Sequence, residues 1–306
     1  MDQVRVQSDS PSGAELRLGT YKAKFKTILV GVDFSGPLVT ALNAAKSLAD
    51  QFGGTLFLVH AVPPVLYGPG ATPELLEADL ETARAQIEGV VSKANLGSIP
   101  HRTVVQFAEP TDLLDEIARS QSADLIVVGS HGAEGLKKLA FGSVAESVLR
   151  RAPCPVLVIG PHCRENLDTI RSIVFATDLE TSAFRPAQYA SSIAEEMNAR
   201  LTLLHVRKPG PKALESSPNG DDRVLLRELR QLLPPDAEQW CEPKVRVEVG
   251  NASEEVLLVA QEEAANLIVV GVRESSTLAD HSPWSTLSQI IRGAECPVLG
   301  VRGHLA

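Results

Sequence analysis

The chain has 306 residues, 44% of them hydrophobic and 22% charged, which suffices for one large domain or two domains of about 150 residues. Its formal net charge of −9 offers no basic surface for nucleic acid or anionic lipid. No apolar run approaches the ~20 residues that a membrane helix needs. We therefore expect a cytoplasmic protein that binds neither nucleic acid nor membrane.

Residues 1–24 are polar and rich in serine and glycine. They lack the apolar core of a signal peptide. This composition predicts a disordered N-terminal tail.

Short β-branched runs bounded by turn residues alternate with helical patterns in the first half of the chain. Buried strands are predicted at 27–32, 55–62, 102–107, 124–129 and 155–160. Helices are predicted at 38–52, 73–94, 111–121 and 143–151.

The same pattern recurs in the second half. Asp33 and Asp178 are 145 positions apart, and so are His60 and His205. Further on, DLIVVG at 124–129 matches NLIVVG at 266–271, and CPVLVIG at 154–160 matches CPVLGV at 296–301. Four matches in the same order indicate a tandem duplication.

Strands of the second copy are predicted at 171–177, 200–206, 244–249, 266–271 and 297–302. Strands that alternate with helices imply βαβ crossovers. We expect an α/β protein of two tandem doubly wound domains, 25–160 and 169–303. Each is a five-stranded, mostly parallel sheet with helices on both faces, and the polar connection at 161–169 lies between them.

Two long connections rich in proline and glycine, 63–73 and 207–222, follow equivalent strands. Each leaves the carboxyl end of a strand, where open α/β sheets bind ligands. Both a mobile lid and a tolerated surface insertion fit this position.

A glycine-rich loop follows the strand at 124–129, with the spacing G-x2-G-x9-G-S from Gly129 through Gly132 to Gly142-Ser143. Glycines allow close backbone approach, and successive N–H groups form an anion-binding concavity. Ser143 is predicted to cap the next helix, whose N-terminus carries partial positive charge. The loop is neither a Walker A motif nor a Rossmann fingerprint, and it indicates a phosphate site.

These features together resemble the universal stress protein family, in duplicated form. The matching residues are Asp33 in VDFS, His60 in LVHAV, the glycine loop and the closing strand CPVLVIG. The resemblance covers nearly the whole chain beyond the tail and implies the family's five-stranded parallel sheet, a fold like that of the adenine nucleotide alpha hydrolases.

The glycine motif resembles that of the ATP-binding branch of the family. The resemblance implies that Val32 and Asp33 contact adenosine and that Ala61 lines the adenine pocket. It also implies that the loop residues hold ribose and phosphates: Gly129, Gly132, Gly142, Ser143 and Val144. The expected ligand is ATP, or ADP or AMP, with Mg²⁺ as a further component.

Asp33 has two interpretations. A carboxylate that ends a buried strand can accept from a ribose hydroxyl or help to hold Mg²⁺. It can equally cap the following helix through Ser35-Gly36-Pro37. His131 and the pair Lys137 and Lys138 lie within the loop, where they either reach a phosphate or face solvent.

Other titratable residues favour structural roles. His60 and His205 occupy equivalent positions, which indicates a shared, partly buried structural histidine. Cys154 and Cys296 begin matching strands and are predicted to pack in the core. No residues show zinc-ligand spacing, and no disulfide is expected in a chain without an export signal.

The second copy keeps the spacing of the glycine loop but not its residues. Gly271 is followed by Val272, Arg273 and Glu274, with Glu274 where Gly132 would be expected, and Trp284-Ser285 stand in place of Gly142-Ser143. Negative charge at a phosphate position is unfavourable. We expect no ATP binding of the family's kind in this copy, although Thr177 and Asp178 leave room for an adenosine-like ligand without phosphates.

The sequence therefore predicts a nucleotide-binding stress-response or signalling protein with its site in the first copy. Two alternatives remain: a slow ATPase, for which no clear general base, arginine finger or Walker B acid is present, and a nucleotide-independent scaffold. The closing strands 155–160 and 297–302 are predicted to pair within one chain as an internal pseudo-dimer. A homodimer is also compatible with the sequence.

Overall fold

The computed structural model describes residues 22–64, 72–130, 142–164, 169–209, 221–235, 237, 241–272 and 282–303. The first half contains β1 (Thr27–Gly31), α1 (Leu38–Phe52), β2 (Thr55–Val62), α2 (Pro73–Ala94), β3 (His101–Phe107), α3 (Pro110–Ser120), β4 (Leu125–Gly129), α4 (Ser143–Arg151) and β5 (Val156–Ile159). The second half contains β6 (Ser172–Thr177), the short helix η2 (Thr181–Ala183), α5 (Phe184–Met197), β7 (Arg200–Arg207), α6 (Asp221–Gln231), β8 (Lys244–Val249), α8 (Ala252–Glu262), β9 (Leu267–Val272), α9 (Ser282–Gly293) and β10 (Val298–Arg302).

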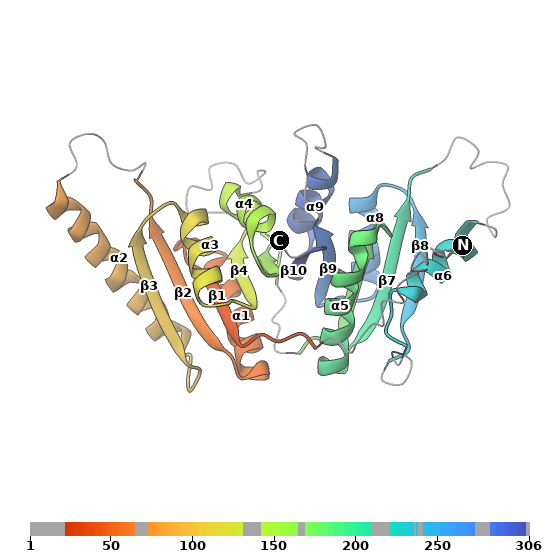
Figure 1. The fold of residues 1–306 in the computed structure, drawn as a ribbon, viewed down its shortest axis with the longest axis horizontal. Helices are drawn as coiled ribbons and strands as arrows, with labels where there is room; N and C mark the ends of the chain where they lie inside the picture. The colour runs from red at the N-terminus through yellow and green to blue at the C-terminus, as the bar shows by residue number, and fades with distance from the viewer. Residues whose placement is uncertain are drawn as a thin grey trace, which may run out of the picture.

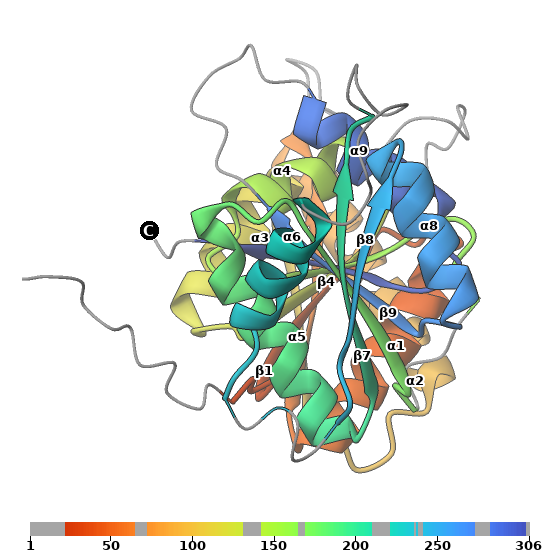
Figure 2. The ribbon, with the colours of Figure 1, turned by 90° about the vertical axis from the view of Figure 1, so that its right-hand side faces the viewer.

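The described strands form one sheet in the order β3-β2-β1-β4-β5-β10-β9-β6-β7-β8. Neighbours within each half are parallel, and the predicted doubly wound α/β fold is confirmed. Each strand lies within one residue of its predicted ends. Seen from the end of the molecule, the strands fan strongly, as expected when twist accumulates across a wide sheet (Figure 2).

The antiparallel pair β5–β10 joins the two halves, with Leu157 opposite Leu299. This is the pairing expected between the closing strands. Figure 1 shows the halves side by side, with β3 near one end of the molecule and β8 near the other. Because β5 and β10 pair with each other, neither apolar strand is left as an exposed edge.

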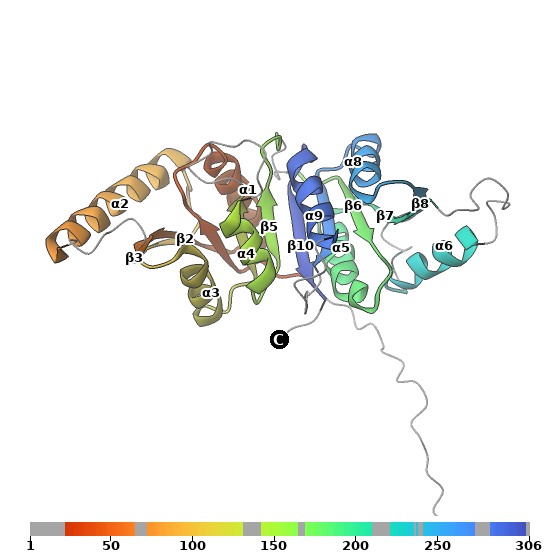
Figure 3. The ribbon, with the colours of Figure 1, turned by 90° about the horizontal axis from the view of Figure 1, so that it is seen from above.

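Two apolar layers cover the sheet, and each runs across both halves. One contains buried residues of α1, α2, α5 and α6, and the other contains buried residues of α3, α4, α8 and α9. Seen from above, α2 and α3 lie on opposite sides of the first half (Figure 3). Side chains from both halves surround a gap of about 10 Å³ at the join: Phe25, Leu48, Leu125, Leu157, Ile170, Ile193, Leu267 and Leu299. The two halves therefore share a core.

The segment before β1 crosses to the second half. Ala23, which the sequence placed in the tail, is 8% exposed, and its N–H donates to Ser192 Oγ in α5 at 2.6 Å. Phe25 is buried beside it. The apolar residues Ala23 and Phe25 alternate with Lys22 and Lys24, so one side of this short segment packs against α5.

Helix ends repeat between the halves. Gly53 ends α1 in the left-handed region with φ 59°, and Asn198, 145 positions later, ends α5 with φ 49°. Both residue types tolerate this conformation at a helix C-terminus.

In the described residues, no helix is long and apolar enough to cross a membrane.

At the join, two equivalent positions, one from each half, each contact the last helix of the other half. A Cβ on Gly160 would lie 2.2 Å from the carbonyl oxygen of Ile291, near the end of α9. At the matching position of the second half, Arg302 Nη1 donates to the carbonyls of Arg151 and Ala152, at the end of α4, at 3.3 and 3.2 Å. The last strand of each half thus contacts the C-terminus of the other half's last helix.

We predict that Gly160→Ala lowers the free energy of unfolding by about 1–3 kcal/mol, because backbone at the join must shift to admit the methyl group. Gly89→Ala is the matched control, since a Cβ there meets nothing within 4 Å. Gly89 lies inside α2, so its replacement should stabilise the protein by up to about 1 kcal/mol. Urea unfolding measures both, and equal stability of the two variants would contradict the tight contact.

Candidate functional site

The order in which strands are added to the sheet reverses at β1 in the first half, because β2 lies on one side of β1 and β4 on the other. Ligands of open α/β sheets bind at such a switch point, at the carboxyl ends of the strands. Val32 and Asp33 follow β1, Ala61 is the next-to-last residue of β2, and Gly129 ends β4. Three adjacent strands therefore bring these four predicted site residues to one edge of the sheet.

The ends of the glycine loop are held together. Gly142 N–H donates to the carbonyl of Ser130 at 2.8 Å, and Ser130 N–H donates to the carbonyl of Ile159 at 2.9 Å. Ser130 is fully buried. The loop residues 131–141, with the predicted His131, Gly132, Lys137 and Lys138, lie outside the described residues.

Helix α4 begins at the predicted phosphate position, but Ser143 does not cap it. Gly142 is the N-cap residue, with φ −63° and ψ 131°, and no side chain caps the helix. Ser143 is the first helical residue and is exposed. The prediction of a serine cap was wrong because the extended backbone falls one residue earlier. The consequence is that the N–H groups of Ser143 and Val144 are in the first turn, where no intrahelical acceptor exists.

Asp33 closes a tight turn. Its Oδ1 accepts from Ser35 N–H at 2.9 Å and from Ser35 Oγ at 2.6 Å. Phe34 between them has φ 57°. The N-cap residue of α1 is Pro37, without a side-chain hydrogen bond, so Asp33 holds the β1–α1 turn rather than capping the helix itself. A carboxylate has a second oxygen, which can accept from a ligand hydroxyl.

His60 and His205 make the same hydrogen bond in the two halves. His60 Nδ1 donates to the carbonyl of Val32 at 2.7 Å, and His205 Nδ1 donates to that of Thr177 at 2.9 Å. Because a carbonyl only accepts, Nδ1 carries the proton in both rings. The predicted structural role agrees with this geometry, in which each histidine fixes the end of the first strand.

The second half differs at the position of the glycine loop. Its strand β9 continues through Val272, which pairs with Arg302, whereas β4 stops at Gly129. Helix α9 begins at Ser282, so Ser285, the counterpart of Ser143, is its fourth residue rather than its first. Glu274 lies outside the described residues. The start of α9 is therefore displaced, relative to the aligned sequence, from the place where α4 starts in the first half.

The cysteines of the closing strands are buried as predicted, with Cys154 8% and Cys296 3% exposed. Burial raises the pKa of the Cys154 thiol to about 12. Such a thiol remains protonated at neutral pH and is a poor nucleophile. Among the described residues, no three His, Cys, Asp or Glu side chains are grouped to hold a metal ion.

Away from the switch point, a cavity of about 360 Å³ lies between α2 and β3. The sequence did not predict it.

Two contributors to the candidate site were also missed. Phe34 packs against the His60 ring, with centroids 4.6 Å apart, and Ser130 closes the loop. The signal available in the sequence was the repeat, in which an apolar residue, Phe34 or Leu179, follows the aspartate after the first strand. In the structure both residues have positive φ, 57° and 63°.

Comparison with known proteins gives one consistent result. The model described as "Universal stress protein family" matches residues 24–160 and 169–302. A universal stress protein of Mycolicibacterium smegmatis is 28% identical over 288 residues, covering 90% of this chain and 96% of that protein. A relative from Thermus aquaticus is 34% identical over 137 residues, covering 44% of this chain and 98% of that protein. A universal stress protein structure from Archaeoglobus fulgidus aligns with a TM-score of 0.72 at 20% identity, covering 92% of this chain and 97% of that one.

We predict that His60→Phe and His205→Phe each lower the free energy of unfolding by about 1–3 kcal/mol, because each leaves a partly buried carbonyl without its donor. Urea unfolding of the single variants tests this. The two losses should be similar, since the two hydrogen bonds are equivalent. A loss confined to one variant would show that the shared structural role is wrong.

Proposed function

Since the chain belongs to the universal stress protein family, we propose that its first half binds an adenine nucleotide at the carboxyl edge of β2, β1 and β4. The proposed ligand is ATP, ADP or AMP. The protein then acts as a nucleotide-binding stress-response or signalling protein, and the second half serves as its intramolecular partner.

The proposed phosphate-binding site is the start of α4. Its first-turn N–H groups, at Ser143 and Val144, lie directly after the loop that leaves β4 at the switch point. A helix N-terminus offers both unpaired donors and the positive end of the helix dipole. Glycines at 129, 132 and 142 let this backbone approach a polyphosphate closely.

The residues proposed to contact adenosine are Val32, Asp33 and Ala61. Asp33 is held in place by Ser35, and its second oxygen is suited to accept from a ribose hydroxyl. Val32 is positioned through the hydrogen bond from His60. If Mg²⁺ accompanies the nucleotide and neutralises phosphate charge, Asp33 is a carboxylate at this edge that would help to hold the ion.

The differences in the second half support a single site. The N-terminus of α9 is displaced along the aligned sequence. Glu274 stands where Gly132 stands in the first half and would repel a phosphate. What the second half retains is the β6–α5 turn with Asp178 and the strand β10 that pairs with β5. These features fit a partner domain.

Binding rather than turnover is the activity that the described side chains favour. Asp33 and His60 are the titratable side chains from β1 and β2 at this edge. Each is engaged in positioning backbone, through Ser35 and Val32 respectively. A phosphate-release assay measures this directly, and we expect release far slower than the 1–100 s⁻¹ typical of kinases.

Mass spectrometry of small molecules released from the purified protein tests the proposed ligand. We expect AMP, ADP or ATP from the wild-type chain.

Gly132→Glu, which places in the first half the residue that the second half has at this position, should weaken ATP binding by about 100-fold or more, because like charges this close cost several kcal/mol. Unchanged ATP affinity in Gly132→Glu would contradict the proposed phosphate position.

The two aspartates provide a matched pair. We predict that Asp33→Ala and Asp178→Ala each lower the free energy of unfolding by about 1 kcal/mol, since each carboxylate accepts hydrogen bonds within an equivalent turn. Only Asp33→Ala should also weaken nucleotide binding. Calorimetric titration with ATP separates the two effects, and equal affinity in both variants would remove Asp33 from the site.

A further inference from the structure

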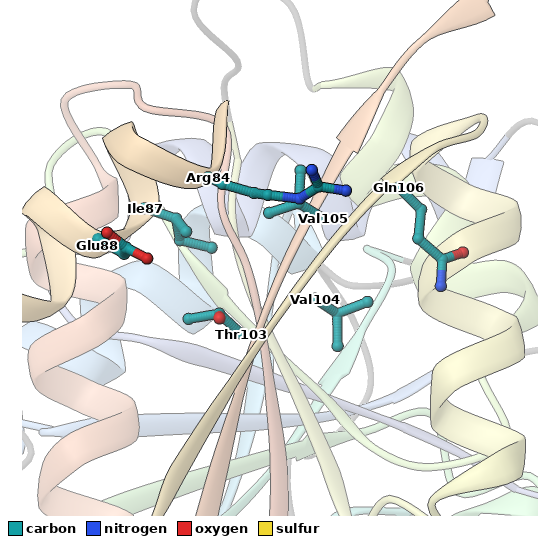
Figure 4. A pocket seen from close by; sticks show the side chains of 7 residues that line it. All are labelled: Arg84, Ile87, Glu88, Thr103, Val104, Val105 and Gln106. Carbon is teal, nitrogen blue, oxygen red and sulfur yellow. The ribbon is translucent and has the colours of Figure 1, made fainter. Parts of the chain in front are cut away.

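Among the described strands, β3 lies at the edge of the sheet, and its outer edge forms one wall of the 360 Å³ cavity. Four consecutive strand residues, Thr103 to Gln106, line it together with Arg84, Ile87 and Glu88 of α2. In Figure 4, Thr103 and Val105 lie on the side of α2, and Val104 and Gln106 lie on the opposite side of the strand. The cavity is thus a groove that follows the outermost strand of the first half.

Backbone groups of β3 point into this groove. Leu56 N–H donates to the carbonyl of Pro100, and Ala108 N–H donates to that of Val62. In a parallel ladder, the residues that bond to the neighbouring strand alternate with residues whose N–H and C=O point away from it. Even-numbered residues of β3 therefore face β2, and the N–H and C=O groups of Thr103 and Val105 point outward.

The other outer strand, β8, is protected by charge. Arg246 pairs with Glu248 and with Glu262 of α8, both at 2.7 Å, and Lys244 pairs with Glu263 at 2.8 Å. Charged side chains on an edge strand oppose pairing with another chain. The position in β3 equivalent to Arg246 is Val104. The charges on the β8 edge therefore oppose pairing with another chain, whereas the β3 edge carries the β-branched apolar residue Val104 at its centre.

We propose that the β3 edge binds a second copy of this chain, with two β3 strands paired antiparallel about a twofold axis at Val104. This is the register that pairs all residues of His101–Phe107. It places Val104 opposite its own copy, Thr103 opposite Val105, Arg102 opposite Gln106 and His101 opposite Phe107. No like charges face each other, and the outward N–H and C=O groups of Thr103 and Val105 meet their counterparts.

Charge on α2 agrees with this symmetry. A twofold interface must be self-complementary. Arg84 and Glu88 lie four residues apart on the groove side of α2, on either side of the buried Ile87. The twofold axis sets α2 antiparallel to its copy. Arg84, which pairs with Glu77 of its own helix at 2.9 Å, then faces Glu88 of the other chain. Phe107, 39% exposed at the end of β3, is covered in the pair.

The mass in solution tests this proposal, which is independent of nucleotide binding. Sedimentation or light scattering should give twice the 32.7 kDa of the chain at micromolar concentrations and above. Val105→Pro removes an outward N–H and places a ring in the path of the partner strand, so it should restore the single-chain mass.

Val247→Pro is the matched control. It occupies the equivalent outward position of β8, since Gly250 N–H donates to the carbonyl of Arg207 as Ala108 N–H donates to that of Val62. It carries the same backbone cost and should leave the dimer intact. A single-chain mass for the wild type, or equal effects of the two prolines, overturns the proposal.

Oxidative cross-linking tests the register without proline. Directly opposite Cβ atoms in an antiparallel pair are about 4.5–5.5 Å apart, near the range that a disulfide spans. Val104→Cys should therefore give a disulfide-linked dimer, and Thr103→Cys, which faces Val105 of the other chain, should not. Cross-linking of both variants alike, or of neither, contradicts pairing centred on Val104.

Discussion

The antiparallel pairing of β5 with β10 is the constraint on which the rest of this structure depends. It converts two five-stranded sheets into one and extends both apolar layers across the join. It also brings Arg302 to the carbonyls that end α4. A cation at a helix C-terminus complements the helix dipole. The second half thereby contacts the other end of the helix whose N-terminus is proposed to hold phosphate.

Duplication has left the scaffold intact and changed one edge. His60 and His205 donate to equivalent carbonyls, and Phe34 and Leu179 share a left-handed backbone beside equivalent aspartates. Non-glycine residues rarely adopt this conformation, so its occurrence twice shows that both copies keep the same turn after the first strand. At the edge that carries the proposed site, the two halves diverge after the fourth strand, where β9 runs longer than β4 and α9 starts earlier than α4. This asymmetry supports the proposal of one nucleotide site per chain.

Most of the fold could be predicted from the sequence because buried parallel strands are short, β-branched and bounded by turn residues, and because the pattern occurs twice. The pairing of the closing strands followed from their apolar sequence. Local details did not follow. Gly142 rather than Ser143 is the cap, since one φ/ψ pair decides it. Ala23 packs on α5, which depends on where the second half lies. The groove beside β3 results from the placement of α2, which periodicity does not specify.

In the proposed function, one copy of the fold holds the nucleotide and the other copy serves as its intramolecular partner. The scaffold residues are duplicated, and the backbone that we propose to bind phosphate is not. Equilibrium titration of the purified, nucleotide-free chain with a labelled ATP analogue tests this most directly, because it counts sites without assuming which residues form them. The account predicts one equivalent of nucleotide per chain at saturation. Two equivalents per chain, or none, would contradict it.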